Sequence, residues 1–144
     1  MRITVSVFDV ASYILKKKGP MSTWKLQKLC YYAQAWSLAW TEKPLFEEDF
    51  EAWSNGPVCR ELFNKHKGMF WINEIQGNPE NLSFDETDTI DIVLRDYGNM
   101  SPYELRELSH SEEPWKNARG NPEDGAHCEN IITKSVMGSY YGAL

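Results

Sequence analysis

The sequence predicts an all-α fold: a compact single-domain bundle of about six helices over residues 1–144, with a short extended segment near residues 50–53. Three observations lead to this prediction. Apolar residues recur every three to four positions in several segments, as on the buried face of a helix. Serine followed three positions later by an acidic residue, a common helix start, occurs at Ser6, Ser83 and Ser101. With 144 residues, of which 42% are hydrophobic, the chain can bury one core without disulfides.

The first two helices are predicted over residues 7–18 and from about 23 to 40. The pair Gly19-Pro20 ends the first helix, because glycine favours the helix terminus and proline cannot continue a helix. Ser22 or Thr23 caps the second helix, whose apolar arc is so wide that we expect it at the centre of the bundle. Its buried face is expected to include Leu26, Leu29, Ala33, Trp36 and Trp40, with Lys25, Lys28 and Tyr31 projecting from the remaining polar sector.

The middle of the chain is predicted to be less regular. Phe50–Trp53 alternates weakly between apolar and polar residues, which indicates a short extended segment. A turn at residues 55–57 follows, with Pro57 at the first position of a third helix that ends near Gly68. Residues 68–82 are predicted to form an irregular loop held by the apolar side chains of Phe70, Trp71, Ile72 and Ile75.

Helices are predicted again towards the C-terminus. One runs from the Ser83 cap to Gly98, and a short one runs from the Ser101 cap through Leu108. Ser111 is a candidate cap for a turn that contains Pro114. A loop of turn-forming residues follows at 120–125, and a final helix is expected to include Ile131, Ile132, Ser135, Val136 and Tyr140.

The charge distribution argues against direct nucleic-acid binding. Residues 1–40 carry six bases and one acid (+5), whereas the remaining 104 residues carry nine bases and twenty acids (−11), which gives −6 overall. Such an acidic chain repels phosphates at long range. Three cysteines without CxxC spacing suit a reducing compartment, and we expect no signal peptide and no membrane span, hence a cytoplasmic protein.

Motifs for catalysis, cofactors or metals are not evident. His127 and Cys128 are adjacent, and no histidine or cysteine pair has the close spacing of zinc sites. Cys30 could act as a nucleophile with His110, but its very apolar helix favours an inert, buried thiol. We therefore expect no catalytic residue, no cofactor and no metal, although an enzyme remains an alternative because catalytic residues need not be close in sequence.

Trp53 and Trp115 allow two interpretations. Each indole can serve the core, since it buries a large apolar area and needs only one hydrogen bond. Alternatively each is part of an interaction hot spot, with Arg60, His110 and Arg119 as neighbouring anchors. Six Trp, seven Tyr and six Phe exceed what a small core needs, so we expect at least one exposed aromatic cluster.

Three segments carry a specific resemblance. They are Lys25-Leu-Gln-Lys-Leu-Cys-Tyr-Tyr-Ala-Gln-Ala-Trp36, Glu51-Ala-Trp-Ser-Asn-Gly-Pro-Val58 and Leu108-Ser-His-Ser-Glu-Glu-Pro-Trp-Lys-Asn-Ala-Arg119. In this order they resemble the motifs of the Panacea antitoxin family, also described as SocA-like or phage-associated GepA-like proteins. Ser109 stands where threonine is common, and residues 120–141 follow the family pattern only loosely.

The resemblance implies a mostly helical domain that neutralises a toxin by direct binding. The leading hypothesis is a bacterial or prophage antitoxin with a cognate protein toxin as its partner; the acidic residues in 42–51 and 80–96 suit a basic toxin. The alternative is a phage-borne inhibitor or protease adaptor that acts on a host protease or defence complex. Candidate partner-binding residues are Lys25, Lys28, Tyr31, Trp53, Asn55, Arg60, His110, Glu112, Trp115, Lys116 and Arg119.

Overall fold

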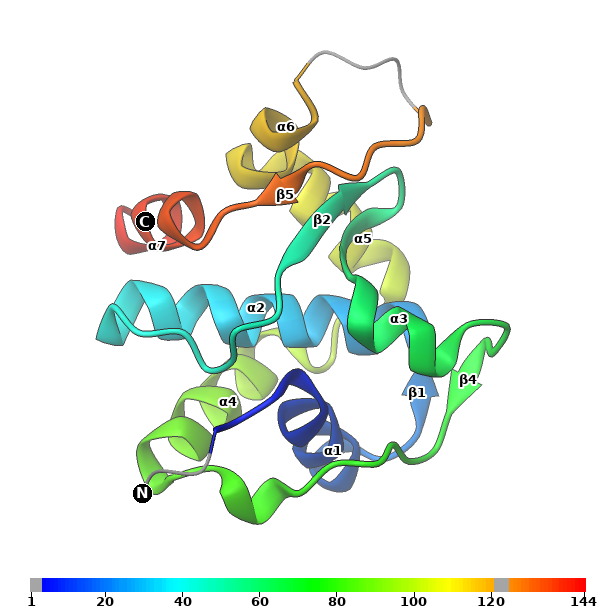
Figure 1. Cartoon of the computed structure of the whole chain (residues 1–144), viewed down its shortest axis with the longest axis vertical. Coiled ribbons are helices and arrows are strands. Elements are labelled where there is room, and N and C mark those ends of the chain that lie inside the picture. The colour runs from blue at the N-terminus through cyan, green and yellow to red at the C-terminus, as the bar shows by residue number, and fades with distance from the viewer. Residues whose placement is uncertain (1–3, 121–124) are drawn as a thin grey trace.

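The computed structural model describes residues 4–120 and 125–144 and is mainly α-helical, with two small antiparallel sheets (Figure 1). The described residues contain α1 (Val7–Lys18), α2 (Thr23–Thr41), α3 (Arg60–His66), α4 (Phe84–Tyr97), α5 (Pro102–Ser111), α6 (Glu113–Arg119) and α7 (Lys134–Gly142), with a 3₁₀ turn at Pro79–Asn81. The predicted mainly α architecture is confirmed. The sheets are a minor addition that an all-α description leaves out.

The predicted helix starts are found at the expected serines. In α4, Ser83 Oγ accepts from the backbone N–H of Glu86 at 3.2 Å, and Glu86 Oε1 accepts from the N–H of Ser83 at 2.9 Å. Ser101 and Glu104 make the same reciprocal pair at the start of α5. These side chains satisfy backbone donors that have no partner within the helix, which is why the sequence signal locates the helix starts.

Five short strands form the two sheets. β1 (Met21–Ser22) pairs with β4 (Trp71–Ile72), and the second sheet has the order β3-β2-β5, formed by Gly56–Cys59, Phe50–Trp53 and Ile131–Ile132. Two predictions are therefore wrong. Pro57 lies in β3 rather than at a helix start, which an edge strand tolerates although proline donates no hydrogen bond. Ile131 and Ile132 form β5 rather than a helix, because these β-branched residues pair with β2.

Helix α2 lies at the centre of the molecule, as predicted. In Figure 1 it crosses the middle, with α1 and α4 on one side and α7, β2 and α6 on the other. Its central residues Leu26, Leu29, Cys30 and Ala33 are fully buried. Trp40 is an exception to the prediction: it is 49% exposed because it lies in the last turn of α2, where its ring packs mainly on Trp36.

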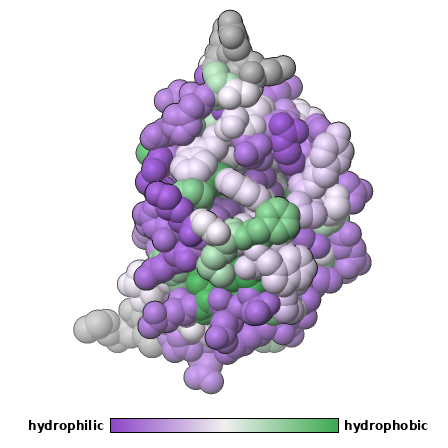
Figure 2. Space-filling model, turned by 90° about the vertical axis from the view of Figure 1, so that its right-hand side faces the viewer, coloured by the Kyte–Doolittle hydropathy of each residue, from purple (hydrophilic) through white to green (hydrophobic). Residues whose placement is uncertain are grey.

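Residues 68–82 are anchored less completely than predicted. Ile72 is buried and Trp71 is 55% exposed, because neighbouring residues of β4 point to opposite sides, and Phe70, which precedes β4, is 76% exposed. Hydrophobic atoms consequently reach the surface on the side of the molecule that carries α3 and β4 (Figure 2).

The segment after α5 also differs from its prediction. Pro114 lies in the first turn of helix α6 rather than in an isolated turn, and Glu112 rather than Ser111 is the residue before that helix. Proline fits this position because its backbone nitrogen needs no helical acceptor there. No helix in the described part of the chain is long and apolar enough to cross a membrane.

Candidate functional site

Gln27 and Gln34 of α2 hold the backbone of two later segments. Gln27 Oε1 accepts from the N–H of Cys59 at 2.8 Å, and its Nε2 donates to the Cys59 carbonyl at 3.1 Å. Gln34 makes the same kind of pair with the N–H of Leu45 at 2.7 Å and the carbonyl of Phe46 at 2.8 Å. Both glutamines are buried, so these motif residues position other segments and do not face a partner.

His66 completes the contacts of Gln27. Its Nε2 lies 3.0 Å from Gln27 Nε2, and because an amide nitrogen only donates, the imidazole accepts this hydrogen bond. Burial lowers the pKa of His66, and the charge of Lys28 acts in the same direction. The imidazole is therefore neutral near pH 7 and serves as a structural acceptor.

Tyr31, Tyr32, Glu112 and Tyr141 form a buried polar cluster. Glu112 Oε1 accepts from the hydroxyls of Tyr32 at 2.7 Å and Tyr141 at 2.8 Å, and the Tyr31 and Tyr141 hydroxyl oxygens lie 3.2 Å apart. Burial raises the pKa of Glu112, although both tyrosine hydrogen bonds act to lower it. Tyr31 does not project as predicted, because α7 covers that sector of α2, and Glu112 likewise lies inside.

Trp115 and Arg119 attach α6 to β2. Trp115 Nε1 donates to the Trp53 carbonyl at 2.8 Å, and Arg119 Nη1 donates to the Ala52 carbonyl at 2.8 Å. The second guanidinium nitrogen of Arg119 reaches the Ala126 carbonyl at 2.6 Å, and its Cζ lies 4.9 Å from the Trp115 ring centre. The Trp115 and Arg119 side chains therefore have clear structural roles, whereas Lys116 points to an exposed position.

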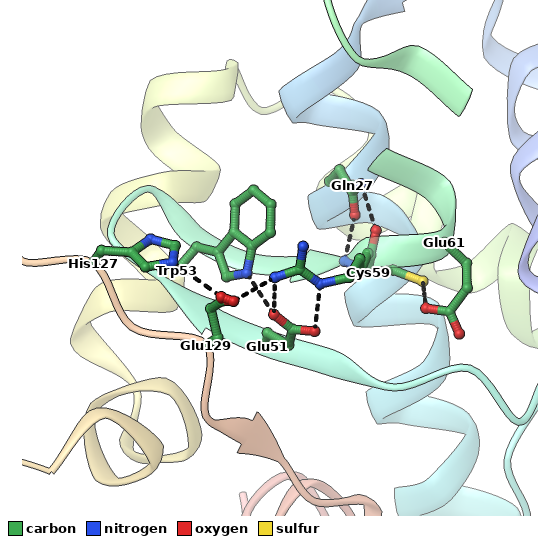
Figure 3. A network of polar contacts seen from close by, with 8 residues as sticks. Gln27, Glu51, Trp53, Cys59, Glu61, His127 and Glu129 are labelled. Atoms are coloured by element: carbon green, nitrogen blue, oxygen red, sulfur yellow. Dashed lines mark hydrogen bonds and ion pairs between the residues drawn. The ribbon is translucent and has the colours of Figure 1, made fainter. Parts of the chain in front are cut away.

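Arg60, the first residue of α3, is the centre of a polar network that includes the labelled Glu51, Trp53 and Glu129 of Figure 3. Its Nε and Nη2 donate to the two carboxylate oxygens of Glu51 at 3.1 and 3.0 Å, and Nη2 also donates to Glu129 Oε1 at 2.9 Å. Trp53 Nε1 donates to Glu51 Oε1 at 2.8 Å. Burial acts to raise the pKa of Glu51, but the hydrogen bonds from Arg60 and Trp53 outweigh it and lower that pKa.

Lys28 is buried, which overturns the prediction that it projects from the helix. Only 1% of the residue is exposed, because the β2–β3 hairpin covers it at Gly56. Its ammonium nitrogen lies 5.3 Å from the Trp24 ring centre. Burial lowers the pKa of Lys28 to about 7, with a further contribution from the positive charge of Arg106. Lys25, one turn earlier, is half-exposed.

His110 is the neighbour of this lysine on α5. Its ring stacks on Trp115 with 3.8 Å between ring centres and an angle of 8° between planes. Burial lowers the pKa of His110 to about 4, and the charges of Arg106 and Lys28 contribute. Its Nε2 atom is buried and has no hydrogen-bond partner among the residues that the structure describes.

The surface beside these groups carries an aromatic strip, which we define as Trp24, Phe63, Trp53 and His127. Consecutive ring centres are 6.4, 4.9 and 6.1 Å apart, and the first three side chains are half-exposed. Both tryptophans of the strip have a basic side chain over the ring. Arg60 Cζ lies 5.2 Å from the ring centre of Trp53, and Lys28 Nζ lies 5.3 Å from the ring centre of Trp24. Exposed Phe70 adjoins the strip, because its carbonyl accepts from the N–H of Thr23.

Cysteine chemistry has little support in this geometry. Burial raises the pKa of Cys59 to about 12, and burial likewise raises the pKa of Cys30. Both thiols therefore stay protonated near neutral pH, and a protonated thiol is a weak nucleophile and metal ligand. Across residues 4–120 and 125–144, no group of three His, Cys, Asp or Glu side chains is arranged to hold a metal ion.

The structure brings together some of the candidate partner-binding residues and separates others. The group around the β2–β3 hairpin consists of Lys28, Trp53, Arg60, His110, Trp115 and Arg119. Tyr31 and Glu112 lie in the interior cluster, and Asn55 is exposed at the hairpin turn. Sequence analysis missed Trp24, Gly56 and Phe63. The spacing of Trp24 and Lys28, one helical turn apart, was a usable signal.

The fold and this surface define a mainly α domain with a mixed aromatic and cationic face, a composition common in protein-binding surfaces. Residues 26–116 match the family described as Antitoxin SocA-like, Panacea domain, and the chain therefore belongs to this family. The family is antitoxin-like and generally non-enzymatic, which suggests a protein partner. No curated protein and no solved structure shows significant similarity to the chain.

Proposed function

We propose that this protein is the antitoxin of a toxin–antitoxin system and neutralises its cognate toxin by direct protein–protein binding. Family membership supports this proposal. The aromatic strip is the observation from which we propose the surface that contacts the toxin. Tryptophan and arginine are the residues most enriched among interaction hot spots, and here Trp24 and Trp53 lie half-exposed beside Lys28 and Arg60.

A second surface suits a basic toxin. Asp85, Asp88 and Asp91 are exposed on α4, and the chain carries a net charge of −6. In Figure 1, α4 lies on the left and α3 and β4 on the right, so this acidic surface is separate from the aromatic strip. Charges outside a contact surface mainly accelerate association through their long-range field.

The test is co-expression with the product of the neighbouring gene, followed by a pull-down and a growth assay. The wild-type chain is expected to bind this product and to restore growth. Phe70→Ala, next to the strip, is expected to weaken binding about tenfold or more. The matched control is Phe84→Ala, since Phe84 is 83% exposed on α4, away from the strip.

Three outcomes decide between the surfaces. Absence of both binding and growth rescue by the wild-type chain contradicts the proposal for that gene pair. Equal binding by the Phe70 and Phe84 variants rejects a contact with the toxin at the Trp24 end of the strip, next to Phe70. Reversal of charge at Asp85 and Asp88 is expected to slow association at low salt, and an unchanged association rate rejects the steering role of α4.

A further inference from the structure

The Lys28 ammonium is buried without a counter-ion. No carboxylate among the described residues lies within ion-pair distance of its Nζ, whereas Arg60 on the same face pairs with both Glu51 and Glu129. Burial of an unpaired charge is costly, and a methionine of similar size would avoid this cost. The aliphatic part of the Lys28 side chain therefore accounts for the packing at this position. It does not account for the presence of a charged group there.

Three distant segments enclose this ammonium. Gly56 has a φ of +117°, a conformation that favours glycine, and an added Cβ there would lie 2.5 Å from Lys28 Cε and 3.2 Å from Nζ. Ser109 Oγ lies 3.2 Å from the same Cβ position. The three residues belong to α2, β3 and α5, so the fold places the head of the lysine directly beneath the hairpin backbone.

The groups that face Lys28 are cationic or neutral. On α5, the charge of Arg106 acts on Lys28, and the charge of Lys28 acts on the pKa of His110, which is neutral near pH 7; Glu107 on the same helix pairs with Arg106 at 3.4 Å. On α3 the neighbouring group is the neutral His66. His110 adds a buried Nε2 that has no partner within the described chain. The Lys28 ammonium is a donor, and so is His110 Nε2 in the tautomer that carries its proton there, so the oxygens of one anion can accept hydrogen bonds from both.

We propose that Lys28, with Gly56, Ser109 and His110, forms the receptor for a carboxylate of the protein partner, either an Asp or Glu side chain or a C-terminus. This inference rests on the proposed function, because it names the chemistry by which the toxin is recognised. A carboxylate suits the site better than a phosphate, since Arg106 already pairs with Glu107 and the ammonium of Lys28 is left to balance a single negative charge. Entry of the carboxylate requires the half-exposed Trp24 ring, whose centre lies 5.3 Å from the ammonium, to move aside.

The first arm of the test measures toxin affinity. Lys28→Met removes the charge and keeps the length of the side chain, so the variant is expected to unfold at the same temperature as wild type or higher. Its affinity for the toxin is expected to fall about tenfold or more, the effect of about 1.4 kcal/mol. Lys16→Met, at an exposed position in the last turn of α1, is the matched control and is expected to change affinity less than about twofold. Equal affinity of the two variants overturns the inference.

The second arm needs no toxin and follows Lys28 by its ¹³Cε chemical shift. Sodium acetate is expected to raise the pKa of Lys28 from about 7 towards its ordinary value, because a bound carboxylate favours the charged amine. Sodium chloride at the same ionic strength is expected to leave it unchanged. Equal titrations in acetate and chloride overturn the site, and a larger effect of inorganic phosphate overturns the choice of a carboxylate. If the wild-type chain binds no toxin, the proposed function fails while this arm still decides whether the site exists.

Discussion

Polar side chains at several core positions of this protein connect segments that lie far apart in the sequence. Gln27 and Gln34 replace missing backbone partners, and Glu112 accepts two tyrosine hydroxyls. A buried polar group is tolerated only when its hydrogen bonds are made, so each of these residues depends on its partners. Glutamine and glutamate are mostly exposed in folded proteins, so the sequence favours a surface position for these residues. Their hydrogen-bond partners can be identified only in the folded chain.

Glu112 provides the residue-scale prediction. Glu112→Ala leaves the hydroxyls of Tyr32 and Tyr141 without their shared acceptor and is expected to lower the free energy of unfolding by about 3 kcal/mol. Glu112→Gln keeps an acceptor oxygen and is expected to cost less. Urea unfolding at pH 6 measures both, and equal stability of the alanine and wild-type proteins contradicts the role of this cluster.

The same variants test the pH dependence. Burial raises the pKa of Glu112 in the folded protein, whereas in the unfolded chain this pKa is about 4.3. The folded protein therefore keeps the proton on the Glu112 carboxyl to a higher pH than the unfolded chain does. The protonated Glu112 carboxyl contributes to the free energy of unfolding in full below the pKa of the unfolded state, and this contribution is lost as the pH rises through the pKa of the folded state. The stability of wild type relative to Glu112→Gln is therefore expected to fall as the pH rises above the unfolded pKa of about 4.3, and a difference that is constant with pH would exclude the raised pKa.

At the scale of elements, most helices were predictable, and among the described strands the sequence predicted β2 alone, as the extended segment near residues 50–53. Helices α1, α2, α4 and α5 carry both apolar periodicity and capping residues, which are local signals. The other strands have two to four residues, too few to show a clear period, and β5 is specified by its pairing with β2. The β2–β3 hairpin is then fixed against α2 by Gln27.

Gln27 provides the prediction for this docking. Gln27→Leu leaves the buried N–H and carbonyl of Cys59 without these partners, and we expect a loss of about 3 kcal/mol or more in the free energy of unfolding. Gln76→Leu at an exposed position is the control, with an expected change within about 0.5 kcal/mol. Denaturant unfolding of both variants is the measurement. A loss below about 1 kcal/mol for Gln27→Leu would show that the hairpin is held by other contacts.

At the scale of the whole molecule, the core extends beyond the segment that matches the family. Residues 26–116 exclude α1 and α7, yet both helices pack on α2. Met137 and Tyr141 of α7 are buried, and the Tyr141 ring lies 6.2 Å from Tyr31 and 5.5 Å from Trp36. We therefore propose that the chain folds as one domain that needs its C-terminal helix.

Truncation tests this proposal. Removal of residues 134–144 takes away two fully buried side chains, each worth about 2 kcal/mol, and uncovers α2. Since domains of this size are stable by only about 5–15 kcal/mol, we expect the cooperative thermal transition to be lost. Circular dichroism during heating measures it, with removal of the exposed Ala143 and Leu144 as the control. A truncated chain that unfolds at the wild-type midpoint would contradict the single-domain proposal.

The sequence by itself determined the helical class, the main helix boundaries and the central place of α2, because these depend on local periodicity and capping. The three motifs also indicated the family. Only the tertiary structure decided what the motif residues do. It turned Lys28 and Tyr31 inward, attached α6 to β2 through Trp115 and Arg119, and left Trp24 beside Phe63 at the surface. Burial and pairing between distant segments depend on which elements cover one another, and no local pattern encodes this.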